Sequence, residues 1–104
     1  MEKTVLVVQT TLPGEWIEAE VGEWVFSIIS ERLATCAQRN KVESTYRGDD
    51  GVEFSSEWRI QLKAPSRNRD DLISKILKIH PYNIPQLLVW DADTSPEYLN
   101  WVQA

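Results

Sequence analysis

The fold prediction starts from residues 51–63, GVEFSSEWRIQLK. Ser56 is the one polar residue on the apolar side of this stretch. The apolar residues recur there at every second position: Val52, Phe54, Trp58, Ile60 and Leu62. A period of two is typical of a strand with one apolar and one polar face. The pattern therefore predicts a strand over 52–63 whose apolar face, with Phe54 and Trp58, belongs to the core.

The segments on either side of this strand alternate in type. The turn Gly48-Asp49-Asp50-Gly51 predicts a hairpin. The spacing of apolar residues, with Ser66 and Ser95 as helix caps, predicts the rest. The expected elements are a strand 4–9, a helix 15–34, strands 36–47 and 52–63, a helix 66–79, a strand 84–90 and a short helix from 95.

This order, β-α-β-β-α-β plus a C-terminal helix, predicts an α+β, ferredoxin-like sandwich in a single domain, residues 1–104. The strands 4–9 and 84–90 are apolar on both faces, whereas two helices cover only one face of the sheet. Another subunit is expected to cover the other face, so the sequence predicts an oligomer.

Composition excludes some partners. The net charge is −5 and the sequence pI is about 4.8, which argues against binding to nucleic acid and to anionic membranes. There is one cysteine, and the N-terminal apolar run 4–8 is too short for a signal h-region. We therefore expect a cytoplasmic protein.

Five blocks, in order, resemble the CutA divalent-ion tolerance family: 31–36 (ERLATC), 44–46 (STY), 56–63, 80–86 (HPYNIPQ) and 98–102 (YLNWV). The resemblance implies a ferredoxin-like protomer, a tight homotrimer and loose association with divalent metals such as copper. It implies no established catalytic reaction. From it we expect a protein of copper tolerance or response that is not an enzyme and requires no cofactor, although Cu or Zn can bind weakly.

The chain departs from the family in the signature block. Asn83 stands where the family usually has Glu, and Gln86 where it often has a second one. Arg47 and Gly48 replace a usual Trp after the tyrosine. The loss of two carboxylates indicates a divergent member with weaker metal binding.

Cys36 and His80 are the candidate metal ligands, because thiolate and imidazole suit copper and zinc. One Cys and one His cannot make a closed four-ligand site within a chain, so we expect sharing between subunits. The alternatives stay open: Cys36 can be a small buried hydrophobe, and His80 a residue that contacts the last carbonyls of its helix.

A ligand or interface pocket is predicted around Tyr46, Glu57, Lys63 and Tyr82, with His80 near its rim. If a subunit covers the polar face of strand 52–63, the charges on it must pair or bind a small anion or metal. Intersubunit ion pairs are the alternative for these charges, and packing is the alternative for Tyr82.

Three rival functions fit the fold class less well. An acylphosphatase-like enzyme needs an arginine in a phosphate loop, and residues 10–14 have none. PII-like trimeric signalling proteins, which bind small ligands, need a long nucleotide-linked loop with basic and glycine residues, whereas the turn at 48–51 is short and acidic. An RNA-recognition module needs aromatics with Lys or Arg on the open sheet face, whereas Phe54 and Trp58 are expected on the core side with the aliphatic residues.

Overall fold

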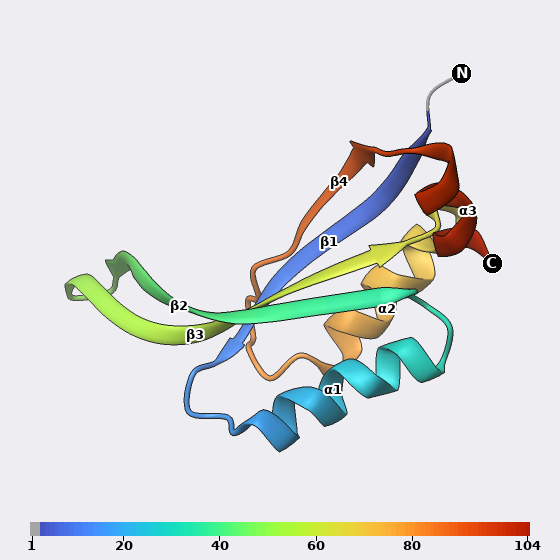
Figure 1. Cartoon of the computed structure of the whole chain (residues 1–104). Coiled ribbons are helices and arrows are strands. Elements are labelled where there is room, and N and C mark those ends of the chain that lie inside the picture. The colour runs from blue at the N-terminus through green and yellow to red at the C-terminus, as the bar shows by residue number, and fades with distance from the viewer. Residues whose placement is uncertain (1–2) are drawn as a thin grey trace.

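The computed structural model describes residues 3–104 as one antiparallel sheet with helices on both sides (Figure 1). The elements are β1 (Thr4–Pro13), α1 (Glu18–Ser30), β2 (Cys36–Gly48), β3 (Gly51–Ala64), a 3₁₀ helix (Ser66–Asn68), α2 (Arg69–Ile79), β4 (Leu88–Asp93) and α3 (Pro96–Gln103). The strand order is β2-β3-β1-β4. The predicted βαββαβ sandwich with a C-terminal helix is confirmed.

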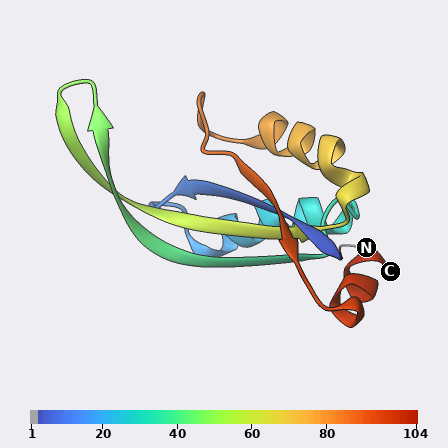
Figure 2. The ribbon, with the colours of Figure 1, turned by 90° about the horizontal axis from the view of Figure 1, so that it is seen from above.

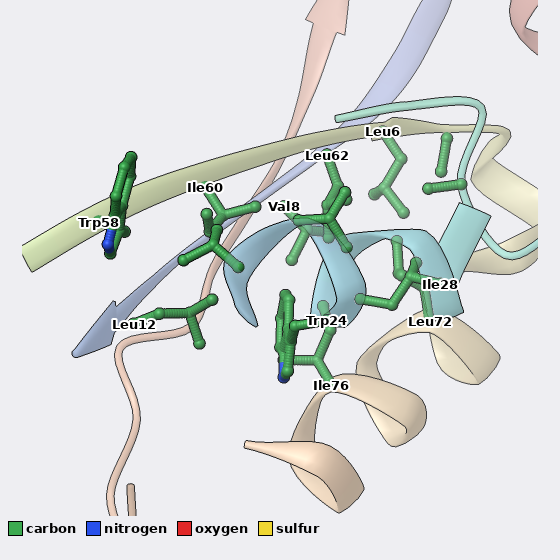
Figure 3. Packing of buried hydrophobic residues seen from close by; sticks show 14 residues of the cluster. Leu6, Val8, Leu12, Trp24, Ile28, Trp58, Ile60, Leu62, Leu72 and Ile76 are labelled. Carbon is green, nitrogen blue, oxygen red and sulfur yellow. The ribbon is translucent and has the colours of Figure 1, made fainter. Parts of the chain in front are cut away.

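The main core lies between the sheet and the helices α1 and α2, which share one face of it (Figure 1). Figure 3 shows how side chains from both layers meet there. The labelled core residues are Leu6, Val8, Leu12, Trp58, Ile60 and Leu62 from the strands and Trp24, Ile28, Leu72 and Ile76 from the helices. Burial of this apolar area is the main stabilising contribution.

The opposite face of the sheet, here called the open face, is covered only in part. Val5 and Val7 pack there against Val102 of α3. Leu88 and Trp90 of β4 pair with Gln9 and Val7 of β1, so they point to the same face, and both are exposed. The chain therefore leaves these two large apolar side chains of the sheet without cover.

The β2–β3 hairpin extends beyond the rest of the sheet (Figure 2). Because β1 ends at Pro13 opposite Glu57, the hairpin beyond that point has only two strands. Trp58 lies in the core as predicted, with 7% of its surface exposed, but Phe54 is 75% exposed. The prediction that Phe54 belongs to the core of the chain is thus wrong, since neither β1 nor a helix reaches it.

Several element boundaries differ from the prediction. The strand β1 continues to Pro13 rather than ending at residue 9, and the helix α1 ends at Ser30 rather than at residue 34. The helix α1 begins at Glu18 rather than residue 15, because a turn bonds the Trp16 N–H to the Pro13 carbonyl. The strand expected over 84–90 is β4, which runs from Leu88 to Asp93. Residues 84–87 lie outside the sheet, and Pro85 has no N–H with which to join a ladder.

The two predicted caps had opposite outcomes. Ser66 does not cap α2, because a 3₁₀ helix intervenes and Asn68 takes the N-cap position without a side-chain bond. Ser95 caps α3: its hydroxyl accepts a bond from the Tyr98 N–H at 3.3 Å. Within residues 3–104 no helix is long and apolar enough to cross a membrane.

Candidate functional site

A pocket of about 670 Å³ lies where the hairpin leaves the sheet. The end of β1, the two hairpin strands and the segment after α2 form its walls. Tyr46, Glu57 and Tyr82, three of the four predicted pocket residues, line it together. They come from β2, β3 and the loop before β4, so only the folded sheet brings them together.

One hydrogen bond ties the pocket's two sides. The Tyr82 hydroxyl donates to Glu57 Oε2 at 3.0 Å. Burial, and then this bond to the negatively charged carboxylate, raise the pKa of Tyr82 above its ordinary value. The Tyr82 hydroxyl therefore stays protonated over the physiological pH range and donates a hydrogen bond to the Glu57 side chain at the pocket wall.

The His80 ring lies beside the Tyr82 ring, with 5.2 Å between the ring centres, and both of its nitrogens are hydrogen-bonded. Its Nδ1 accepts from the Tyr82 backbone N–H at 3.1 Å, and its Nε2 lies 2.9 Å from Thr10 Oγ1. The Thr10 hydroxyl donates to the Gln86 carbonyl at 2.7 Å, so its oxygen accepts the hydrogen bond from the His80 Nε2–H. Burial lowers the pKa of His80, opposed by the Thr11 backbone and the Glu57 charge. His80 is thus a neutral imidazole, and it does not bond the last carbonyls of α2.

Cys36 lies on the other side of the sheet. It pairs with Lys63, which in turn pairs with Val7 of the open face. Its neighbour there is Tyr98 of α3, whose pKa is raised by burial and then by the Cys36 charge. Cys36 is half-buried rather than fully enclosed.

The two predicted metal ligands are therefore not brought together in one chain. His80 bonds Thr10 on the helix-covered face, and Cys36 lies on the open face, so the sheet separates them. Among residues 3–104 there is also no group of three or more His, Cys, Asp or Glu side chains placed to hold a metal ion. The donor set of a single chain does not make a closed metal site.

Lys63 does not belong to the pocket, so its grouping with Glu57 needs correction. The two lie six residues apart on β3, which is about 20 Å along a strand. The Lys63 ammonium donates instead to the Gln38 side chain on the open face. A shared face of a strand was a sound inference, but it did not imply proximity.

Sequence reasoning missed Thr10, and it considered Gln86 only as the replacement of a carboxylate in the signature block. Thr10 is fully buried and connects His80 to the Gln86 carbonyl. The Gln86 side-chain oxygen accepts from Gln9, whose own oxygen accepts from Gln61 at 2.8 Å. The signal was available: two polar residues, Gln9 and Thr10, directly follow the apolar run 5–8.

The family model that matches this chain is that of the CutA1 divalent ion tolerance protein, over residues 6–104. A similar curated protein is the divalent-cation tolerance protein CutA of Pyrococcus horikoshii. It is 30% identical over 98 residues, which are 93% of each chain.

Solved structures show the same fold. CutA from Synechococcus elongatus PCC7942 superposes with a TM-score of 0.88 at 23% identity, over 98% of this chain and 90% of that one. The periplasmic divalent cation tolerance protein CutA from Archaeoglobus fulgidus gives a TM-score of 0.83 at 17% identity, over 94% of both chains.

Proposed function

This chain belongs to the CutA1 divalent ion tolerance protein family, and from that premise we propose that it acts in divalent-cation tolerance as a non-catalytic homotrimer that binds a cation weakly. The observation that supports assembly is the apolar surface left uncovered on one chain, and the number of three subunits is what the family resemblance implies. Leu88 and Trp90 are exposed on the open face, and Phe54 and Val52 on the hairpin. Monomeric proteins rarely leave such an area to water.

Light scattering coupled to size-exclusion chromatography tests the assembly. We expect a mass three times the 12.0 kDa of one chain. Phe54→Asp should reduce that mass, since it buries a charge if the hairpin packs on another subunit. Phe26→Asp is the matched control, because Phe26 is equally exposed but lies on α1. A wild-type monomer at micromolar concentration contradicts the proposal.

For the cation we propose Cys36 as the principal ligand, with copper preferred over magnesium. The Cys36 thiolate is a soft donor and lies on the face that we assign to subunit contacts. Ligands from neighbouring subunits would complete the site, since one chain has too few. His80 is the second candidate, but it must first release the Tyr82 N–H or its Thr10 contact.

Calorimetric titration of Cu²⁺, Zn²⁺ and Mg²⁺ tests the cation. Wild type should bind Cu²⁺ weakly and Mg²⁺ not measurably, and Cys36→Ser should lose most of the Cu²⁺ affinity. His80→Ala should retain it if the internal bonds of His80 are structural. Binding should also weaken as the pH is lowered, because protons compete with the cation for the thiolate. Equal binding by wild type and Cys36→Ser contradicts the assignment.

The pocket around Tyr46, Glu57 and Tyr82 supports a second candidate, a trimer that binds a small polar ligand in the manner of PII-like proteins. Its walls carry the carboxylates of Glu15 and Glu57, and neither Lys nor Arg lines it. A nucleotide phosphate is therefore poorly matched to it. Titration with ATP separates the candidates: no binding is expected, and measurable ATP binding would favour the second.

We also propose that the protein works in the cytoplasm. Support comes from its single cysteine, which fits a reducing compartment. The Archaeoglobus relative is named periplasmic, so the periplasm is the alternative. Cell fractionation followed by immunoblotting distinguishes the two.

A further inference from the structure

Arg32 has a backbone conformation that favours glycine. Its φ is +63°, and among residues 3–104 it is the one non-glycine residue with positive φ. It follows the C-cap of α1: the Arg32 N–H donates to the Ile29 carbonyl at 2.9 Å and the Leu33 N–H to the Ile28 carbonyl at 3.2 Å. This is the Schellman ending, whose left-handed position is usually glycine. An arginine here carries a backbone cost, so its side chain is a candidate for a function.

Arg32 lines a second pocket, of about 250 Å³, at the end of the molecule opposite the hairpin tip. The end of α1, the 3₁₀ helix before α2, and α3 surround it; Figure 1 shows them gathered there. Its lining combines Arg32, Thr35, Arg67 and Asn68 with Ala104 and with four apolar residues, which are here called its floor: Ile29, Ala34, Pro65 and Val102. The volume is below the roughly 300–1,000 Å³ of sites for drug-sized ligands, so only a small molecule fits.

The donors left open in this pocket are cationic. The Asn68 amide is used up, since it donates to the carbonyls of Arg32 and Leu33 at 3.2 and 3.1 Å. Thr35 likewise donates to a carbonyl of α3. Arg67 gives one of its five N–H groups to the Gln103 carbonyl at 3.1 Å and keeps the others.

The charge of Arg32 has no counterpart. Within residues 3–104 its guanidinium makes no ion pair and no hydrogen bond, and the side chain is exposed. No Asp or Glu side chain of the described residues lines the pocket; Ala104, at the C-terminal end of α3, also lines it, and no ion pair joins its carboxylate to either arginine. Two guanidinium groups above an apolar floor are suited to an oxyanion, which arginine binds through pairs of N–H groups.

We propose that this pocket binds a small acid whose phosphate or carboxylate group contacts Arg32 and Arg67 and whose short apolar body lies on the floor. The site is separate from the Tyr46–Glu57–Tyr82 pocket and from Cys36. It requires neither the cation nor catalysis. The chain thus has an anion site in addition to its role in divalent-cation tolerance, despite its net charge of −5.

Isothermal titration at constant ionic strength tests the proposal with three probes: inorganic phosphate, butyrate and propyl phosphate. Wild type should bind propyl phosphate more tightly than inorganic phosphate, because the propyl group adds apolar burial. Binding of butyrate as well assigns the site to oxyanions in general; binding of the phosphates alone assigns it to phosphate. Binding of none of the three overturns the proposal.

Arg32→Gly is the decisive variant. Glycine suits the positive φ, so this protein should fold at least as well as wild type and keep its thermal midpoint. Its affinity for propyl phosphate should nevertheless fall at least tenfold, as should that of Arg67→Gln. Arg69→Gln is the matched control, because Arg69 is exposed beside Asp70 and lies outside the pocket. Unchanged affinity in Arg32→Gly, or an equal loss in Arg69→Gln, overturns the proposal.

Discussion

The Tyr82 hydroxyl donates a 3.0 Å hydrogen bond to the Glu57 carboxylate, and this bond joins the loop after α2 to the third strand of the sheet. No other side-chain hydrogen bond within residues 3–104 links that loop to β3. The contribution of this bond to stability therefore indicates whether the loop is packed against β3. Because the Tyr82 hydroxyl can ionise, this contribution depends on pH.

We predict that Tyr82→Phe lowers the free energy of unfolding by about 1 kcal/mol at pH 7. A bond to a charged acceptor contributes more than this when buried, but the pair is partly exposed. The pKa of Tyr82 is raised in the fold, so its contribution is complete below the unfolded value of 10.0 and is lost as pH rises further. Chemical denaturation between pH 7 and 11.5 should show a smaller alkaline loss in Tyr82→Phe. An equal loss in both proteins contradicts the bond.

His80 gives the opposite pH dependence. Its pKa is lowered in the fold, chiefly by burial, so below pH 6.5 the unfolded chain takes up a proton more readily than the folded one. The stability that His80 contributes is complete above pH 6.5 and is lost as the pH falls through the lower folded pKa. We predict that thermal midpoints of wild type decrease from pH 7 to 5, and that His80→Asn removes part of this decrease. NMR titration of the ring protons checks the direction of the shift independently.

Much of the fold was predictable because its signals are local. The alternation at Trp58, Ile60 and Leu62 gave the central strand, and the Ser95-Pro96 pair gave the start of α3. Phe54 continues the same alternation, yet it is exposed. The apolar pattern of one strand does not show how long the neighbouring strand is. Because β1 ends opposite Glu57, it does not reach Phe54.

The site was predictable only in part, for a related reason. Tyr46, Glu57 and Tyr82 do meet, but the sequence could not show that the sheet separates Cys36 from His80. The distance of Lys63 was available, because six residues of one strand span about 20 Å. Which face a residue occupies depends on register, and register depends on pairs distant in the sequence. The bonds of His80 to Thr10 and the Tyr82 N–H are likewise tertiary.

Two glycines provide a matched pair of substitutions. A Cβ on Gly14 would lie 2.0 Å from the Ser56 carbonyl oxygen, so the backbone of β3 or of the loop must move. A Cβ on Gly22, inside α1, would meet only the Arg39 guanidinium at an ordinary 3.7 Å. We predict that Gly14→Ala lowers the free energy of unfolding by about 1–3 kcal/mol, whereas Gly22→Ala raises it by about 0.5–1 kcal/mol. Urea denaturation of both variants measures this, and a stable Gly14→Ala protein means that the loop does not approach β3 so closely.

The last prediction separates the core of the chain from the surface between chains. Trp58 is buried, its Nε1 donates to the Trp16 carbonyl at 2.9 Å, and the Lys41 ammonium lies 4.7 Å from its ring centre. Trp58→Ala should therefore lower the free energy of unfolding by about 3–5 kcal/mol, through lost burial and a cavity.

Phe54→Ala is its matched control, four residues away on the same face of β3 but exposed in the single chain. In this variant we expect near-native secondary structure but dissociation on dilution, because only contacts between subunits are lost. Circular dichroism measures the first effect and light scattering across a dilution series measures the second. If Phe54→Ala unfolds like Trp58→Ala at every concentration, the hairpin is part of the protomer's own core; if it changes neither quantity, the hairpin does not contribute to assembly.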